Sequence, residues 1–141
     1  VEQYRRRISG PLLDRIDLHV EAMPVEYEAL AAETGGESSA AIRARVTAAR
    51  KVQQARCKDL PGVRCNAQLP GAALRRYCRM TPKAEQILRA AFERLGYSAR
   101  AYDRILRVAR TIADLDGSEQ LDAAHLSEAL QYRTLDRKMM R

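Results

Sequence analysis

Two consecutive helices are predicted by residues 81–115, TPKAEQILRAAFERLGYSARAYDRILRVARTIADL. Thr81 can cap the first helix, and Pro82 suits the first helical position, where no intrahelical bond needs its missing N–H. Gly96 is suited to end that helix, and Ser98 can begin the next one. Apolar residues recur through the stretch at spacings of three and four. We therefore expect one helix up to Gly96 and a longer one that runs to the end of the stretch.

The longer helix has one apolar face and one face rich in arginine. At 100° per residue, the apolar side chains that fall within one arc are those of Ala101, Ile105, Val108, Ile112 and Leu115. Arg100, Arg104 and Arg107 cluster on another arc. This helix is expected to pack its apolar face and to offer its arginines on the other.

Further helices follow from similar patterns. Ser38 can cap a helix that runs to about Cys57, and a short helix is expected over residues 72–78. Asp122 can cap a final helix, and residues 133–141 are expected to trail off as a polar tail. The fold class is therefore mainly α, with an antiparallel bundle of four or five helices from about residue 38 onward.

The first thirty residues have a different pattern. Residues 16–22, IDLHVEA, alternate apolar and polar side chains between Pro11 and Pro24, which predicts a short, half-buried strand. One strand needs neighbours, and we expect them in a region upstream. We accordingly assign residues 1–30 to the end of a larger core and residues 31–141 to the helical domain.

Composition narrows the class of protein. The 141 residues carry 25 Lys and Arg against 18 Asp and Glu, a formal charge of +7, and 46% are hydrophobic, which suits a folded domain. No apolar run reaches the roughly 18 residues of a membrane span, so no membrane association is expected. The chain opens without an initiator Met, and we expect it to be a segment of a longer cytoplasmic protein.

The cysteines and histidines do not predict a metal site. The three cysteines have no zinc-ligand spacing, and the two histidines lie far from them in sequence. We expect free thiols in a reducing compartment and histidines that are surface or packing residues. These residues are Cys57, Cys65, Cys78, His19 and His125.

The helix after Ser38 is strongly basic. No acidic residue lies between Ser38 and Lys58, so part of this helix must face water, phosphate or an acidic partner. Charge alone gives only sequence-independent, salt-sensitive attraction to nucleic acid, and a solvated helix face is the alternative. The seven aromatic residues are scattered in sequence and indicate no stacking platform. The candidate nucleic-acid contacts are Arg43, Arg45, Arg50, Lys51 and Arg56.

Arg15 is a candidate phosphate ligand. It follows a turn and two leucines in residues 8–18, ISGPLLDRIDL, which would hold its loop at both ends. A fixed guanidinium can neutralise charge on a transferring phosphoryl group. Alternatively, Arg15 pairs with Asp14 or Asp17 at the surface. The chain contains neither a P-loop motif nor a catalytic triad pattern, so we do not expect it to hydrolyse nucleotide alone.

Four blocks of sequence resemble the C-terminal part of the ComM/YifB family, the magnesium-chelatase-like AAA+ ATPases of bacteria. They are YRRRISGPLLDRIDLHV (4–20), GESS (36–39), NAQLPG (66–71) and LGYSARAYDRILRVARTIADL (95–115). The resemblance covers essentially the whole chain. It implies the lid of a homo-hexameric ring ATPase that binds ATP and Mg²⁺ between subunits in the full-length parent, and none in this fragment alone.

The resemblance also implies roles for two arginines. Arg15 matches the arginine finger that reaches a neighbouring subunit's γ-phosphate, and Arg100 matches the sensor 2 arginine at the start of a lid helix. A solvated helix-face arginine is the alternative for Arg100. The family is associated with natural transformation, where it is thought to act as a DNA helicase in branch migration. A basic DNA-binding module and an assembly domain of a chelatase-type ATPase are the alternative functions.

Overall fold

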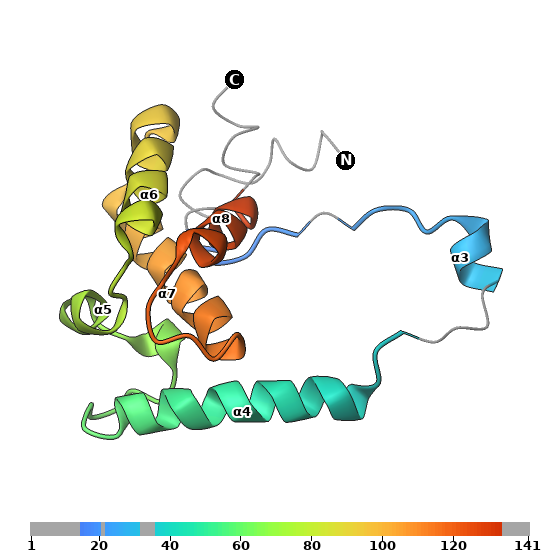
Figure 1. Cartoon of the computed structure of the whole chain (residues 1–141), viewed down its shortest axis with the longest axis horizontal. Coiled ribbons are helices and arrows are strands. Elements are labelled where there is room, and N and C mark those ends of the chain that lie inside the picture. The colour runs from blue at the N-terminus through green and yellow to red at the C-terminus, as the bar shows by residue number, and fades with distance from the viewer. Residues whose placement is uncertain (1–14, 21, 32–35, 134–141) are drawn as a thin grey trace.

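The computed structural model describes residues 15–20, 22–31 and 36–133, and it confirms the mainly α fold class (Figure 1). The prediction for the loop before Arg15 lies outside these residues. The elements in chain order are α3 (Tyr27–Ala31), α4 (Ser39–Cys57), the 3-10 turn η1 (Asn66–Gln68), α5 (Gly71–Tyr77), α6 (Pro82–Leu95), α7 (Ala99–Leu115) and α8 (Ala123–Gln131).

The predicted capping residues set the ends of the main helices. The side chains of Ser38, Thr81 and Ser98 each accept a hydrogen bond from the backbone N–H three residues on. Asp122 does the same for α8 and forms a capping box with His125. Gly96 ends α6 in the left-handed conformation, with φ of 59°. These helix boundaries are confirmed.

Helix α7 lies at the centre of the helical domain. It packs against α4, η1, α5 and α8, while α6 packs against α8. Of the five apolar side chains predicted to share one arc, Ala101 and Ile105 are buried, Val108 and Ile112 are half-buried, and Leu115 is 42% exposed. The buried face is therefore turned toward Ala109 and Ala113, which are 0% exposed. Burying a side chain such as that of Ile105 contributes about 1.5–3 kcal/mol. The larger core residues contributed by the other segments are Leu69, Leu74, Leu88, Leu121 and Leu126.

Helix α4 is covered over only its C-terminal half. Ala49, Gln53 and Cys57 are buried, whereas residues 39–48 are all exposed. The N-terminal half of α4 extends beyond α5, α6, α7 and α8 in Figure 1. Half of this helix is therefore presented as surface.

The strand expected over residues 16–22 is not formed in the described residues 16–20 and 22. Among the residues that the structure describes, no neighbouring strand supplies a ladder, and three backbone groups of the segment bond to the helical domain instead. The N–H of His19 donates to the carbonyl of Tyr132 at 2.8 Å, and Nη1 of Arg133 donates to the carbonyl of Ile16 at 2.8 Å. This segment lies as coil against the end of α8.

The prediction of a polar tail from residue 133 onward is wrong for Arg133. Arg133 is 1% exposed and holds the N-terminal segment through Ile16, so a cation that looks like tail in the sequence is part of the interior. Residues 134–141 lie outside the described part. Among the helices of the described residues, none has the length and apolar character to cross a bilayer.

Candidate functional site

Arg104 fixes the segment that begins at Arg15 onto helix α7. Its Nη1 donates to the carbonyl oxygen of Arg15 at 2.8 Å and pairs with the Asp17 carboxylate. The contact joins residues 89 positions apart in the chain. The backbone of Arg15 therefore has a defined place beside the N-terminal half of α7.

The side chain of Arg15 points to the surface. Arg15 is exposed, and within the described residues no hydrogen bond or ion pair engages its guanidinium. Asp17, one of the two acids considered as its surface partner, pairs with Arg104 instead. The other acid, Asp14, lies outside the described residues. The Arg15 guanidinium is thus exposed and unengaged among the described residues.

Arg100 stands in the first turn of α7, one helical turn before Arg104. It is exposed, and the first-turn position places it near backbone N–H groups that have no intrahelical acceptor. Four residues along a helix correspond to about 6 Å of rise, so Arg100 lies on the side of α7 that holds the Arg15 backbone. The helix dipole also favours an anion at this end. We call the exposed side chains of Arg15 and Arg100 the arginine surface.

Two arginines predicted to face solvent are used inside the chain. Besides Arg104, Arg107 donates from Nε and Nη2 to the carbonyl oxygen of Leu69 at 3.3 and 2.9 Å. These bonds hold the loop before α5 against α7. The expectation that α7 offers all three arginines is therefore corrected, and Arg100 alone of the three makes no ion pair or hydrogen bond within the described residues.

A buried polar group, here called the Asp114 cluster, joins α4, η1 and α7. The Asp114 side chain is completely buried and accepts two bonds from Arg56, at 2.5 and 2.7 Å. Asn66 donates from Nδ2 to the same carboxylate at 2.7 Å, and Arg110 donates from Nε at 3.1 Å. The hydrogen bond to Asp114 is the main cause that raises the pKa of Arg56.

The five cations of α4 that were candidate nucleic-acid contacts differ in how far they are exposed. The Arg56 side chain is 11% exposed and bound to Asp114, so it is engaged inside the chain rather than on the exposed face of α4. Arg45 pairs with Glu37 at 2.6 Å on the exposed end of α4. The remaining cations are exposed and make no ion pair within the described residues; they are Arg43, Arg50 and Lys51.

The thiols are free, and two of them are shielded. Cys57 and Cys78 are buried, and burial raises the pKa of both, that of Cys78 to about 11. Cys65 is half-buried. The described residues bring together no group of three or more His, Cys, Asp or Glu side chains that could hold a metal ion.

Sequence reasoning missed the residues that position the site. Arg104 looked like one more helix-face arginine, since its partners are 87 and 89 residues away. Arg56 and Asp114 are 58 residues apart, and helical periodicity carries no information on such pairs. The single hint was that Arg104 follows Arg100 by four residues and so shares its face.

Comparison with known proteins identifies the family. The family model described as magnesium chelatase, subunit ChlI C-terminal, matches residues 36–133. The chain belongs to this magnesium chelatase C-terminal family. A second model, magnesium chelatase, subunit ChlI, matches residues 1–30. The resemblance to magnesium-chelatase-like AAA+ proteins is thereby confirmed.

Relatives of this magnesium chelatase C-terminal chain align along nearly all of it. It is 40% identical to Competence protein ComM of Haemophilus influenzae over 100% of this chain and 27% of that protein. It is 40% identical to Uncharacterized protein YifB of Escherichia coli over 98% of this chain and 26% of that protein. The chain thus spans about a quarter of the length of the curated relatives it matches.

Proposed function

We propose that this chain is the C-terminal lid region of a ring-forming AAA+ ATPase, and that its arginine surface contacts ATP. Arg15 acts as an arginine finger on the γ-phosphate of ATP bound by a neighbouring subunit, and Arg100 acts as sensor 2. The observation that carries the proposal is the bond from Arg104 to the Arg15 carbonyl, which holds one exposed arginine about one turn from the other.

The chemistry of the arginine surface suits phosphoryl transfer. A guanidinium stays charged at any physiological pH and can donate two parallel hydrogen bonds to phosphate oxygens. Charge on the γ-phosphoryl group grows and redistributes in the transition state, so an arginine that meets it there lowers the barrier. Because Arg104 and Asp17 fix the backbone beside Arg15, less conformational entropy is lost when its side chain engages.

ATP and Mg²⁺ belong to the full-length parent in this proposal. The two exposed arginines and the N-terminus of α7 fit the phosphates. The described residues bring together no group of three or more His, Cys, Asp or Glu side chains that could hold a metal ion, and in this proposal the protein ligands of Mg²⁺ come from other parts of the parent. We propose a homo-hexamer in the cytoplasm, in which each subunit completes a neighbour's nucleotide site.

Replacing Arg15 in the full-length protein tests the proposal. Arg15→Ala should lower the rate of ATP hydrolysis by about 10³-fold or more, because arginine fingers act on the transition state. Affinity for a fluorescent ATP analogue should change by only a few-fold. Arg89→Ala removes an exposed arginine of α6 that belongs to neither proposed site, and it is the matched control. Equal loss of binding and hydrolysis would contradict the finger role, and failure to form the ring would favour an assembly domain.

We propose further that hydrolysis is coupled to DNA branch migration in natural transformation, with α4 as a DNA contact. The printed name of the Haemophilus relative, a competence protein, supports this direction. The specific observation is that Arg43, Arg50 and Lys51 are exposed on α4. At 100° per residue they fall within an arc about 100° wide, which borders the buried face of the helix on its Cys57 side.

Salt dependence of binding tests the DNA contact. Replacing Arg43, Arg50 and Lys51 by Gln should weaken duplex binding and reduce the slope of log affinity against log salt by about 2–3. The same change at Lys83, Arg89 and Arg94, exposed cations of α6, alters net charge equally and is the control. Identical slopes for the two triple variants would exclude α4 as a specific contact.

A further inference from the structure

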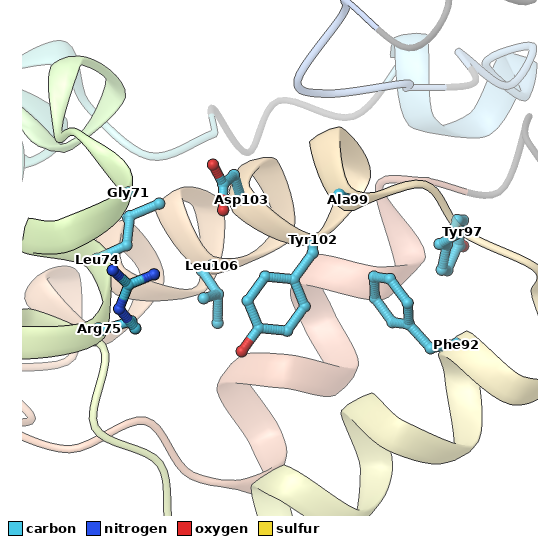
Figure 2. Close-up of a pocket in the computed structure, with 9 residues that line it drawn as sticks. All are labelled: Gly71, Leu74, Arg75, Phe92, Tyr97, Ala99, Tyr102, Asp103 and Leu106. Carbon is cyan, nitrogen blue, oxygen red and sulfur yellow. The ribbon is translucent and has the colours of Figure 1, made fainter.

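A pocket of about 460 Å³ opens between α5, the end of α6 and the start of α7 (Figure 2). This volume falls within the range of about 300–1,000 Å³ that is typical of small-molecule sites. Its walls are largely apolar or aromatic, with one cation and one carboxylate. The aromatic and charged residues that line it are Arg75, Phe92, Tyr97, Tyr102 and Asp103.

Three of the chain's seven aromatic rings gather at this pocket. The Phe92 ring lies 5.4 Å from that of Tyr97 and 5.5 Å from that of Tyr102, both in edge-to-face geometry. All three side chains are half-buried, so the cluster still presents aromatic surface. Residues that are separate in the sequence therefore form one aromatic wall, which composition alone did not indicate.

The polar groups are placed at one end of the pocket. In Figure 2 the Tyr102 ring lies between the Arg75 guanidinium on one side and the Phe92 ring on the other. Arg75 donates no hydrogen bond within the described residues, and the next residue, Arg76, covers the Tyr77 ring at 5.2 Å. The Tyr102 hydroxyl, like that of any tyrosine at neutral pH, carries its proton and can donate a hydrogen bond, and burial raises its pKa further.

We propose that this pocket binds one unpaired base of a single-stranded nucleic acid, with Arg75 on the adjoining phosphate. The aromatic wall suits the π-face of a base, which every base presents. Arg75 and Arg76 have no acidic residue on their helix and outnumber the one carboxylate that lines the pocket, that of Asp103, so α5 supplies positive charge to the phosphate backbone. The inference rests on the DNA branch of the proposed function and names the part of the nucleic acid that is held.

A base-free oligonucleotide separates base insertion from simple charge attraction. Fluorescence anisotropy at low salt measures the affinity of the full chain for two labelled strands. One is a 15-nucleotide thymidine strand, and the other has equal length and charge but is built from abasic sites. The wild-type chain should bind the base-containing strand roughly 5- to 150-fold more tightly, the range expected for stacking one base. Equal affinity for the two strands would overturn the proposal without reference to any variant.

Variants of the pocket residues provide a second, independent test of base binding. Phe92→Leu with Tyr102→Leu should remove most of the preference for the base-containing strand, whereas Tyr102→Phe should keep most of it, because the ring remains. Arg75→Gln should weaken both strands alike. Tyr27→Leu, at a tyrosine that is 77% exposed and outside the pocket, is the matched control and should change nothing.

Two further outcomes would also contradict base binding in the pocket. If the chain binds neither strand at low salt, the proposal of base binding is wrong. The ATPase proposal is tested separately by Arg15→Ala. If the pocket variants bind DNA normally but alter assembly of the parent, the occupant of the pocket is a side chain of a neighbouring subunit. This result too would contradict base binding. Unfolding curves of every variant identify any that lose the fold.

Discussion

Asp114 joins three segments of the chain through one buried carboxylate. It accepts hydrogen bonds from Arg56 on α4, from Asn66 in η1 and from Arg110 one turn earlier on α7. Its charge is the counter-charge for two guanidiniums that are themselves nearly buried, with side chains 11% and 2% exposed. Arg110 in addition reaches the backbone carbonyls of Ser118 and Glu119, so the loop before α8 depends on the same group.

Replacing Asp114 by Asn should be strongly destabilising. The variant keeps the volume but leaves Arg56 and Arg110 without their carboxylate, which should lower the free energy of unfolding by about 3–5 kcal/mol. Urea unfolding followed by circular dichroism measures this change. Asp103→Asn is the control, because that side chain is 41% exposed and lies 3.9 Å from Arg107, and it should cost less than about 1 kcal/mol. Similar losses for the two variants would contradict the proposed importance of the cluster.

The thiols should differ in reactivity. A raised pKa keeps Cys57 and Cys78 protonated at pH 8, well below the value of about 11 for Cys78, and both are buried. We expect one thiol, that of Cys65, to react quickly with an aromatic disulfide reagent in the native chain. All three should react in denaturant. Rapid reaction of all three without denaturant would show that the interior around α7 opens easily.

At the scale of single elements, capping residues made the helix ends predictable. Ser38, Thr81, Ser98 and Asp122 act through contacts within three residues, and such contacts can be read from sequence. The alternation over residues 16–22 was misleading, because a strand depends on partners that local pattern does not supply. Helix α3 was missed.

Gly96 tests how much one helix end contributes. Its φ of 59° is a conformation that costs a residue with a Cβ about 1–2 kcal/mol, so Gly96→Ala should lower the free energy of unfolding by that amount. Gly71→Ala is the matched substitution in the first turn of α5, where a Cβ would lie an ordinary 3.9 Å from Asp103. Thermal unfolding should show little change for it. Equal losses of stability at Gly96 and Gly71 would contradict a specific contribution of the left-handed glycine at the end of α6.

At the scale of the whole molecule, α7 connects the proposed site to the core. The face of α7 that carries Ile105 and Ala109 is buried, Arg104 and Arg107 hold the N-terminal segment and the loop before α5, and the first turn presents Arg100. The sequence motifs pointed to Arg15 and Arg100 individually. Their placement beside the same helix could not be predicted, because it depends on Arg104 and Arg133 contacting residues that are 89 and 117 positions away.

The most direct test of the shared nucleotide site mixes two inactive forms of the full-length protein. One form carries Arg15→Ala, and the other has an intact Arg15 but lacks the lysine of its own P-loop. If Arg15 acts on a neighbour's ATP, mixed rings contain sites with an intact P-loop beside an intact Arg15, and ATP hydrolysis should recover in part. Hydrolysis that stays at the sum of the two separate forms, or near wild-type activity of Arg15→Ala alone, would contradict the account.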